Sequence, residues 1–496
     1  MMYAIHWFRR DLRVATNPAL AKSRARTGGK VLGLFCVDPQ IVSRPDTGID
    51  RFAFVLESVA ALREELRTAG GDLLVLPGTP EEAFGRIFSE CARHGSARPA
   101  IVSFNRDYEP FARDRDTRLT RLLEQENGVE VVTDRDHLVF EPGEITPQSG
   151  DGHYRVFSPF EKRWRAVFAE QRHRVPDRAD NPGGRTPGIR FTWSDLPGTG
   201  RELQRHDVID TTRDSVQPRV RVTLPPAGRV AAHRRLSEFL AGPIASYDEA
   251  RDIPAVDGTS RLSIYLKVGS LTTAEIIAAL DSPDRETARP GRAPGPQAPG
   301  IERFLTELIW REFYYHILYH QPRVEHEPFL TRYWRLQWDD DESRFDAWKA
   351  GLTGFPIVDA GMRQLKATGW MHNRVRMIVA SFLTKDLHID WRRGEAYFMD
   401  RLLDGDLAAN NGGWQWAAST GCDPQPYFRI FNPERQSRRF DPDGEYIARW
   451  VPELAALDKK SRHAPPEDAR PNGYPAPIVD HARERKVALE RYRAIV

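Results

Sequence analysis

The stretch from Trp370 to Trp416 reads WMHNRVRMIVASFLTKDLHIDWRRGEAYFMDRLLDGDLAANNGGWQW. Its first half is basic, and the acidic, amide-rich segment 404–413 near its end is expected to form a polar turn. Four tryptophans lie within it: Trp370, Trp391, Trp414 and Trp416. A basic helix, a polar turn and several indoles are typical of a site that binds a charged, redox-capable aromatic molecule close to a polyanion.

Length and composition limit the classes of protein that this chain can represent. A chain of 496 residues is too long for one ordinary core, so at least two domains are expected. The net charge is only +2, so an argument for nucleic-acid binding must rest on local basic clusters. Three cysteines without metal-ligand spacing, and no apolar run of membrane-spanning length, predict a reduced cytoplasmic protein without disulfides, metal or membrane anchor.

The N-terminal third alternates short apolar runs with helical segments. This alternation predicts a doubly wound parallel sheet, with ligands beyond the carboxyl ends of its strands. Polar loops at 36–39 and 105–109 lie at such ends, although spacing alone favours ordinary turn chemistry for them. No GxGxxG follows the first run, which argues against the usual dinucleotide fold. The expected strands are Tyr3–Phe8, Val31–Val37, Leu73–Leu76, Ala100–Phe104 and Glu130–Thr133.

The rest of the chain divides into a connection and a helical half. Between residues 135 and 226 the pattern weakens and Pro, Gly, Arg and Asp accumulate, which indicates a long interdomain linker. Strand signals end near residue 227, and residues 282–300 are expected to form a mobile loop. The predicted organisation is therefore an α/β domain (1–134), a linker (135–226) and an all-α domain (227–496), with helices expected at 228–241, 272–280, 300–319, 343–350, 357–368, 371–386, 392–402 and 478–494.

Two helical faces and one turn carry candidate chemistry. The small hydroxyl-rich run GTSRLS at 258–263 could hold a phosphate, although such turns more often only cap helices. Glu307, Trp310, Arg311 and Tyr314 share one helical face, and Asn373, Arg376 and Met377 share another. Amphipathic helices with aromatic or Met side chains in the core explain these faces equally well.

The chain resembles the photolyase/cryptochrome flavoproteins over nearly its whole length, and most closely the class I cyclobutane pyrimidine dimer photolyases. The motifs that carry the resemblance are HWFRRDLRV, DGTSRLS, ELIWREFY, TGFPIVDAGMRQL, TGWMHNRVRM, DGDLAANNGGWQWAAST and PYFRIFNP. Several long motifs in the same order make it specific. It implies an N-terminal antenna domain, a helical FAD-binding domain and light-driven electron transfer from reduced FAD to a dimer.

The resemblance assigns cofactor roles residue by residue. Residues around the FAD phosphates, the adenine and the flavin ring are Tyr247, Thr259, Ser260, Arg261, Leu262, Ser263, Arg311, Arg376, Asp404, Asp406 and Asn410. Arg376 and Asp404 would form a buried ion pair that positions the ring. Asn410 would face flavin N5, where an uncharged amide tolerates an anionic reduced ring better than a carboxylate would. Trp414, Trp391 and Trp338 would relay electrons between flavin and surface, although three core indoles would be placed similarly.

The same resemblance implies contacts with UV-damaged DNA. The damaged dinucleotide leaves the duplex and enters the site, at a lower cost because it already stacks poorly. Its binding positions would be Glu307, Asn373, Met377, Trp310 and Trp416. Glu307 would stabilise the developing radical anion through a hydrogen bond. Arg374 and Arg429 would lie on DNA phosphates, with Trp310 and Trp416 packed against the dimer.

An antenna pigment is expected in the N-terminal domain. The deazaflavin branch resembles this chain at Cys36, Asp38, Arg51 and Asp107, and the folate branch at Glu109. Glu325 stands where the folate branch has Lys, and it would repel an anionic folate tail. An 8-hydroxy-5-deazaflavin or another flavin-like ring is therefore ranked above 5,10-methenyltetrahydrofolate, with an empty pocket as a further alternative.

Three alternatives to dimer repair differ in testable ways. A cryptochrome photoreceptor would signal rather than catalyse, but the chain retains Asn410 and the Glu307, Asn373 and Met377 set. A (6-4) photolyase would carry His at Asn373. An unrelated nucleotide-binding α/β protein with a helical partner domain would not purify yellow. The expected partner is DNA alone, with a monomeric, cytoplasmic protein and no obligate protein partner.

Overall fold

The computed structural model describes residues 2–147, 152–171, 188–281, 298–471 and 473–495. Five parallel strands form one sheet in the order β3-β2-β1-β4-β5, which confirms the predicted parallel sheet. All residues of β1, β2 and β4 are buried except Val37, because helices cover both faces. The strands are β1 (Ala4–Phe8), β2 (Val31–Val37), β3 (Leu73–Pro77), β4 (Ile101–Asn105) and β5 (Glu130–Asp134).

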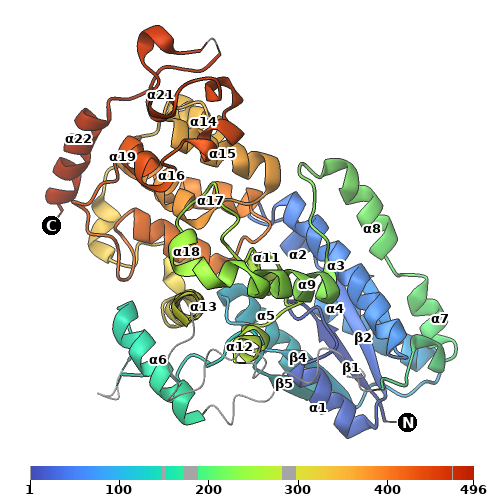
Figure 1. Cartoon of the computed structure of the whole chain (residues 1–496). Helices are drawn as coiled ribbons and strands as arrows, with labels where there is room; N and C mark the ends of the chain where they lie inside the picture. The colour runs from blue at the N-terminus through green and yellow to red at the C-terminus, as the bar shows by residue number, and fades with distance from the viewer. Residues whose placement is uncertain (1, 148–151, 172–187, 282–297, 472, 496) are drawn as a thin grey trace.

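Helices follow the strands as the N-terminal pattern predicts. Asn17 caps the first of them through its side chain, with Pro18 at the first helical position, which are residue types that favour these positions. Figure 1 shows the sheet and its helices at the lower right of the molecule. The helices of this part are α1 (Pro18–Thr27), α2 (Pro39–Val42), α3 (Ile49–Thr68), α4 (Pro80–Arg93) and α5 (Pro110–Arg121).

The segment that the sequence indicates as a linker contains helices that pack on both halves. α6 (Phe157–Gln171) packs against the long helix α13, α7 (Thr199–Gln204) against α4, and α8 (Ile209–Val216) against α3. The helical pattern was missed here because Pro, Gly and charged residues dominate the composition. The expected loop at 282–300 falls mostly outside the described residues.

The C-terminal half is helical, as predicted. Its helices are α9 (Gly228–Ala241), α10 (Tyr247–Ala250), α11 (Ser263–Val268), α12 (Thr273–Leu280), α13 (Ala298–His320), α14 (Glu342–Ala350), α15 (Pro356–Thr368), α16 (Asn373–Lys385), α17 (Trp391–Arg401), α18 (Leu407–Ala417), α19 (Pro433–Phe440), α20 (Glu445–Trp450), α21 (Lys459–His463) and α22 (His481–Arg493). One hydrophobic cluster runs from the sheet into this half and includes Phe8, Phe54, Tyr265 and Phe313. The two halves therefore share a continuous core.

The prediction of a polar turn at 404–413 is wrong for most of this segment, because residues from Leu407 onward are helical. The Asp406 side chain accepts from the Ala409 backbone N–H and caps α18, which then runs through both asparagines and both glycines. Capping, two alanines and the packing of Trp414 in the core outweigh the weak helix propensity of Asn and Gly. Asn410 and Trp414 therefore share one helix, one turn apart.

Candidate flavin and DNA site

A cavity of about 890 Å³ opens between α11, α13, α16, α17 and α18. Nine residues singled out from the sequence line its wall: Ser263, Arg311, Asn373, Arg376, Met377, Asp404, Asp406, Asn410 and Trp414. The tertiary structure thus brings together residues that lie up to 151 positions apart in the chain.

Arg376 and Asp404 form the ion pair that was expected. Arg376 Nη2 lies 2.9 and 3.1 Å from the two carboxylate oxygens of Asp404, and its Nε donates to the Met371 carbonyl at 2.8 Å. Ser263 Oγ donates to the same carboxylate at 2.6 Å. Asp404 is buried, so this pair is held in one geometry on the cavity wall.

Asp406 stays charged within the wall. Its Oδ2 accepts from the Tyr315 hydroxyl at 2.5 Å and from Arg10 Nη2 at 2.7 Å, and Lys267 Nζ lies 3.6 Å away. Burial favours the neutral acid, but Lys267, Arg10 and Arg311 outweigh it and hold the pKa of Asp406 well below its usual range.

The first turns of α18 fit a flat ring. Asn410 Nδ2 donates to the carbonyl and to Oε1 of Glu395, at 3.1 Å each, which fixes the amide at the cavity wall. Gly413 lines the cavity, and a Cβ added there would meet nothing within 4 Å. Burial raises the pKa of Glu395 to about 7. The wall therefore combines an open backbone surface with an amide and an ion pair, which is a donor set that suits a flavin.

The hydroxyl-rich turn contributes less to the cavity than the sequence suggested. Among the described residues, Ser263 is the only member of the run 258–263 in the cavity wall. The carbonyls of Thr259 and Ser260 accept from Arg235 at 3.0 and 2.9 Å, and Leu262 is in the core. Arg261 lies over the Trp370 ring at 4.7 Å. Tyr247 packs edge-on against Phe239 and Phe304.

The residues expected to bind a lesion come from three helices. Asn373 and Met377 of α16 line the cavity. On α13, Glu307 pairs with Arg251 at 2.5 Å and with Arg303 at 3.2 Å. Trp310 stacks on Phe157 of α6, with ring centroids 3.6 Å apart and planes 7° apart. Trp416, at the end of α18, is half-buried beside Phe431 at 6.5 Å.

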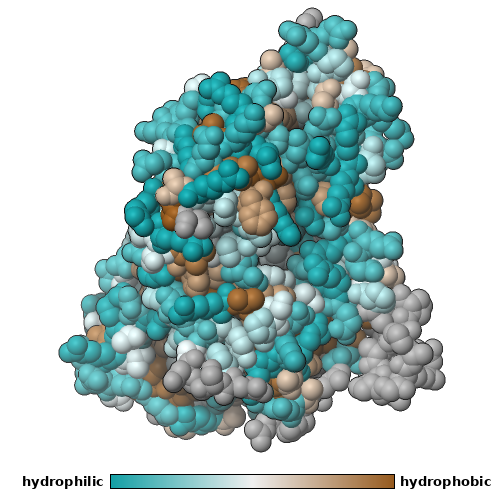
Figure 2. Space-filling view, turned by 90° about the vertical axis from the view of Figure 1, so that its left-hand side faces the viewer, coloured by the Kyte–Doolittle hydropathy of each residue, from teal (hydrophilic) through white to brown (hydrophobic). Residues whose placement is uncertain are grey.

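The two arginines expected on DNA phosphates differ in their surroundings. Arg374 pairs with Asp252 at 2.9 Å and lies over the Phe440 ring at 4.3 Å. Arg429 is exposed, next to Phe428, whose side chain is 55 % exposed. Figure 2 views the molecule from the left-hand side of Figure 1. This face is largely hydrophilic, with apolar side chains gathered near its centre.

The three relay tryptophans belong to one hydrophobic cluster. Trp414 and Trp391 are both buried and Trp338 is half-buried, so only the last member of the expected path reaches solvent. Trp414 also lines the cavity, 6.1 Å from the buried ring of Trp348. Burial alone does not separate an electron relay from an aromatic core.

A second cavity of about 1230 Å³ lies beyond the carboxyl ends of β1, β2 and β4. All five expected antenna residues line it: Cys36, Asp38, Arg51, Asp107 and Glu109. Arg51 donates to the backbone carbonyls of Met399 at 2.5 Å and Leu402 at 2.9 Å, so its guanidinium joins the sheet domain to α17. Glu325 lies 3.6 Å from Arg44, another residue of this wall.

Sequence reasoning missed two cations that line these cavities, Lys267 and Arg10, and a third, Arg251, that pairs with Glu307. Lys267 lines both cavities, and its position four residues after Ser263 on α11 was a usable signal. Arg251 similarly follows Tyr247 by four residues. Nothing in the sequence indicates that Arg10, in the loop after β1, contacts Asp406 in the other half of the chain.

The fold and the smaller cavity define a two-domain protein that is built to hold a large polar ring system within its helical half. Models of two families match: "DNA photolyase" at residues 4–179 and "FAD binding domain of DNA photolyase" at residues 304–494. The chain therefore belongs to the DNA photolyase family, and its helical half is an FAD-binding domain.

Relatives and solved structures agree with this assignment. The chain is 39 % identical to the deoxyribodipyrimidine photo-lyase of Vibrio cholerae over 98 % of both chains, and 40 % identical to that of a Synechococcus strain over 97 % of this chain and 94 % of the relative. A class III photolyase structure from Agrobacterium tumefaciens superposes with a TM-score of 0.82 at 36 % identity, covering 100 % of this chain and 98 % of the other. A Synechocystis cryptochrome superposes with a TM-score of 0.81 at 25 % identity, over 99 % of each chain.

Proposed function

We propose that this protein repairs cyclobutane pyrimidine dimers in UV-damaged DNA, using light and bound FAD. The observation that carries the proposal is the wall of the smaller cavity, where Asn373 and Met377 adjoin the Arg376–Asp404 pair and Asn410. The names of the Vibrio and Synechococcus relatives support it. The class I assignment stays a prediction, since the similar structure from Agrobacterium tumefaciens is that of a class III photolyase.

Each residue of the site would have a separate role in repair. Bound FAD, in its reduced form, supplies the photoexcited electron that opens the dimer. Arg376 and Asp404 orient the ring, and Asn410 presents an amide without added charge. Asn373 and Met377 contact the flipped dinucleotide, while Trp310 and Trp416 offer indole faces to it. Arg374 and Arg429 bind phosphates, which makes affinity depend on salt.

The remaining FAD contacts are also proposed from the resemblance. Thr259, Ser260, Arg261, Leu262 and Ser263 would surround the phosphates, and Arg311 would lie beside the adenine. The Arg235 contacts support this placement only indirectly, because they hold the turn in one conformation while occupying two of its carbonyls. Ser263 has the strongest support, because it lines the cavity.

The decisive experiment incubates purified protein with an oligonucleotide that contains one cyclobutane dimer, in light and in darkness. Recovery of the undamaged thymines in light but not in darkness would support repair. If the protein holds reduced FAD and no repair occurs in light, the result contradicts the proposal and favours a photoreceptor. A matched oligonucleotide with a (6-4) photoproduct is the control. Repair of the (6-4) lesion instead of the dimer would make this chain a (6-4) photolyase.

For the larger cavity we propose a flavin-like antenna ring, with deazaflavin first and folate second. Asp107 would accept from a ring N–H, and Glu325 near the cavity opposes an anionic folate tail. A solved archaeal relative from Sulfolobus tokodaii, 31 % identical with a TM-score of 0.76, is described as holding two FAD molecules, which supports a flavin-like ring. Because Arg51 already donates to backbone carbonyls, we propose that it shapes the wall.

The antenna proposal has its own test. Each pigment is mixed with the FAD-loaded protein, and energy transfer to FAD is measured by its excitation spectrum. Binding of methenyltetrahydrofolate with no binding of deazaflavin would reverse the ranking. Asp107→Ala is expected to weaken binding of the flavin-like pigment. An unchanged affinity for the pigment would show that Asp107 does not contact it.

The partner proposed for the protein is damaged DNA, with action as a cytoplasmic monomer that needs no second protein. In the described part of the chain, no helix combines the length and the apolar character that crossing a bilayer demands. Sedimentation of the protein with and without duplex DNA tests the monomer.

A further inference from the structure

The two cavities share a charged wall. Lys267 lines both of them, Arg10 lines the larger one, and Asp406 lines the smaller one. Arg10 follows β1, and Asp107 and Glu109 follow the adjacent strand β4. This is the edge of the sheet where the strand order reverses, and ligands of doubly wound folds bind at that edge.

The Arg10 guanidinium contacts residues that line both cavities. Arg10 Nη1 donates to Glu109 at 2.6 Å and lies 3.4 Å from Asp107, both in the larger cavity. Arg10 Nη2 donates to Asp406 at 2.7 Å and to the Tyr315 hydroxyl at 2.6 Å. Only a planar fork with several N–H groups can make these contacts at the same time.

Two cations contact the carboxylates that separate the cavities. Arg10 pairs with Asp107, Glu109 and Asp406, and Lys267 Nζ lies 3.4 Å from Glu109 and 3.6 Å from Asp406. Arg311 also acts on Asp406, and Arg9 and Arg115 act on Asp107, from farther away. Burial lowers the pKa of Arg10, but Tyr315 and the three carboxylates outweigh it and raise this pKa well above its usual value. His137, 3.2 Å from Arg10, adds no charge, because burial, Arg311 and Arg10 hold its pKa well below its usual value.

Because Arg10 and Lys267 contact carboxylates at both cavities, the charge balance at one cavity depends on what is bound in the other. A ligand in the larger cavity that takes hydrogen bonds from Arg10 or Lys267 leaves Asp406 less compensated. A less compensated Asp406 opposes a negative charge in the smaller cavity, because the wall lies away from bulk water and the Coulomb interaction is weakly screened there.

We propose that Arg10 is a positioning residue that couples the two cavities: a ring bound in the larger cavity draws on Arg10, and the anionic reduced flavin in the smaller cavity is destabilised. The inference rests on the proposed assignment of FAD to the smaller cavity. Coupling is reciprocal, so flavin reduction also weakens binding of the ring. Coupling between sites of this kind typically changes an affinity by roughly 5-fold to 150-fold.

The test measures the midpoint potential of bound FAD in the holoprotein, with and without 8-hydroxy-5-deazariboflavin. Arg10→Met should lower the potential in the pigment-free protein and abolish the further drop that the pigment causes in the unmodified protein. Arg9→Met is the matched control. Arg9 lines the same cavity, but its guanidinium contacts Asp116 at 2.5 Å, the Asn105 carbonyl and the rings of Trp7 and Phe104, so both behaviours should persist.

Arg10→Lys keeps the charge without the fork and should retain the potential while losing most of the coupling. It also remains informative if Arg10→Met does not fold. A pigment-induced shift that survives in Arg10→Met, or its absence from the unmodified protein despite pigment binding, would overturn the inference.

If no pigment binds, an equal potential in Arg10→Met and Arg9→Met overturns the inference, whereas a lower potential in Arg10→Met alone supports it. Failure of dimer repair in the unmodified protein would instead count against the proposed function, since repair is measured separately from these potentials.

Discussion

Glu307 is held by two guanidinium groups in this structure. In these ion pairs its carboxylate only accepts hydrogen bonds, so donation to a pyrimidine carbonyl would require Arg251 to release it and a proton to bind. Arg251 is itself mostly buried. The role of Glu307 in lesion binding therefore depends on its ion pair with Arg251.

Replacing Glu307 with Ala is expected to lower the repair yield per absorbed photon and to weaken dimer binding. Loss of a buried hydrogen bond costs about 1–3 kcal/mol, and Arg251 would also lose its closest carboxylate. Quantum yield and dimer affinity are measured for Glu307→Ala and for Glu307→Gln, which keeps the shape without the charge. An unchanged yield in Glu307→Ala would remove this residue from the site.

Replacing Trp338 with Phe is expected to block photoreduction of oxidised FAD while leaving the fold intact. Phe fills most of the same apolar space but is much harder to oxidise than an indole. Transient absorption in the presence of an external reductant measures the yield. Trp348→Phe is the matched control, since Trp348 lies in the same cluster 6.1 Å from Trp414. Photoreduction at the normal rate in Trp338→Phe would place the path elsewhere.

At the scale of elements, one carboxylate joins three segments of the chain. Glu312 of α13 accepts from the backbone N–H groups of Val139 at 2.8 Å and Phe140 at 2.9 Å, and from Trp164 Nε1 of α6 at 2.8 Å. It thus binds two parts of the predicted linker to the helix that carries Trp310 and Arg311. The first part of the linker, as far as α6, is therefore a structural part of the helical half.

The stability of this junction should depend on pH. Burial raises the pKa of Glu312 to about 7, although its three N–H donors lower it. A raised pKa in the folded state gives stability that is present below the unfolded value of 4.5 and is lost as pH rises through about 7. Between pH 5 and 8 the loss is expected to be on the order of 3 kcal/mol.

Unfolding free energies of the unmodified protein and Glu312→Gln across this pH range measure that effect. The amide cannot ionise, so the difference between the two proteins should shrink or reverse as pH rises. Glu302→Gln, on the exposed side of the same helix and paired with Arg165 at 2.9 Å, is the control and should show no such trend. Parallel pH profiles for Glu312→Gln and the unmodified protein would contradict the expectation.

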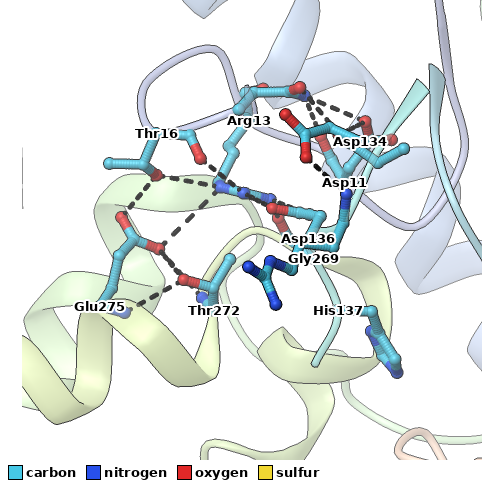
Figure 3. Close-up of polar contacts among 12 residues, drawn as sticks. Asp11, Arg13, Thr16, Asp134, Asp136, His137, Gly269, Thr272 and Glu275 are labelled. Carbon is cyan, nitrogen blue, oxygen red and sulfur yellow. Dashed lines mark hydrogen bonds and ion pairs between the residues drawn. The ribbon is translucent and has the colours of Figure 1, made fainter. Parts of the chain in front are cut away.

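At the scale of the whole molecule, the loop after β1 joins the halves. Figure 3 shows Arg13 between Asp136 and the Gly269 carbonyl, with Thr16 and Glu275 beside it. Arg13 is fully buried, and Nη1 lies 3.0 Å from both Asp136 and Gly269. Arg13 and Arg10 lie in the same loop between β1 and α1, so one short segment contributes to both the domain interface and the wall between the cavities.

Arg13→Met is expected to destabilise the protein by about 3–5 kcal/mol, because it leaves buried carboxylates without this cation. Arg26→Met is the matched control, since Arg26 pairs with Glu130 at 2.6 Å on the exposed surface and should contribute less than about 1 kcal/mol. Chemical unfolding measures both changes. Equal effects of the two substitutions would show that the buried cluster is unimportant for stability.

The sequence alone determined the strands, most helices and the residue types of both cavities. Short apolar runs and helical periods such as that of α3 depend on local patterns that are visible in one chain. Asn373, Arg376 and Met377 were correctly placed on one helical face for the same reason. Long motifs shared with a known family indicated the cofactor, lesion and relay residues, and nine of these line one cavity.

Apart from the Arg376–Asp404 pair, only the tertiary structure decided which charges meet. The α18 helix formed where a turn was expected, because packing of Trp414 and the Asp406 cap outweigh local propensity. The contact of Arg10 with Asp406 joins residues 396 positions apart, and the Glu307–Arg251 pair joins residues of different helices. Pairing of buried charges depends on distances across the fold, and a linear pattern contains no information on those distances.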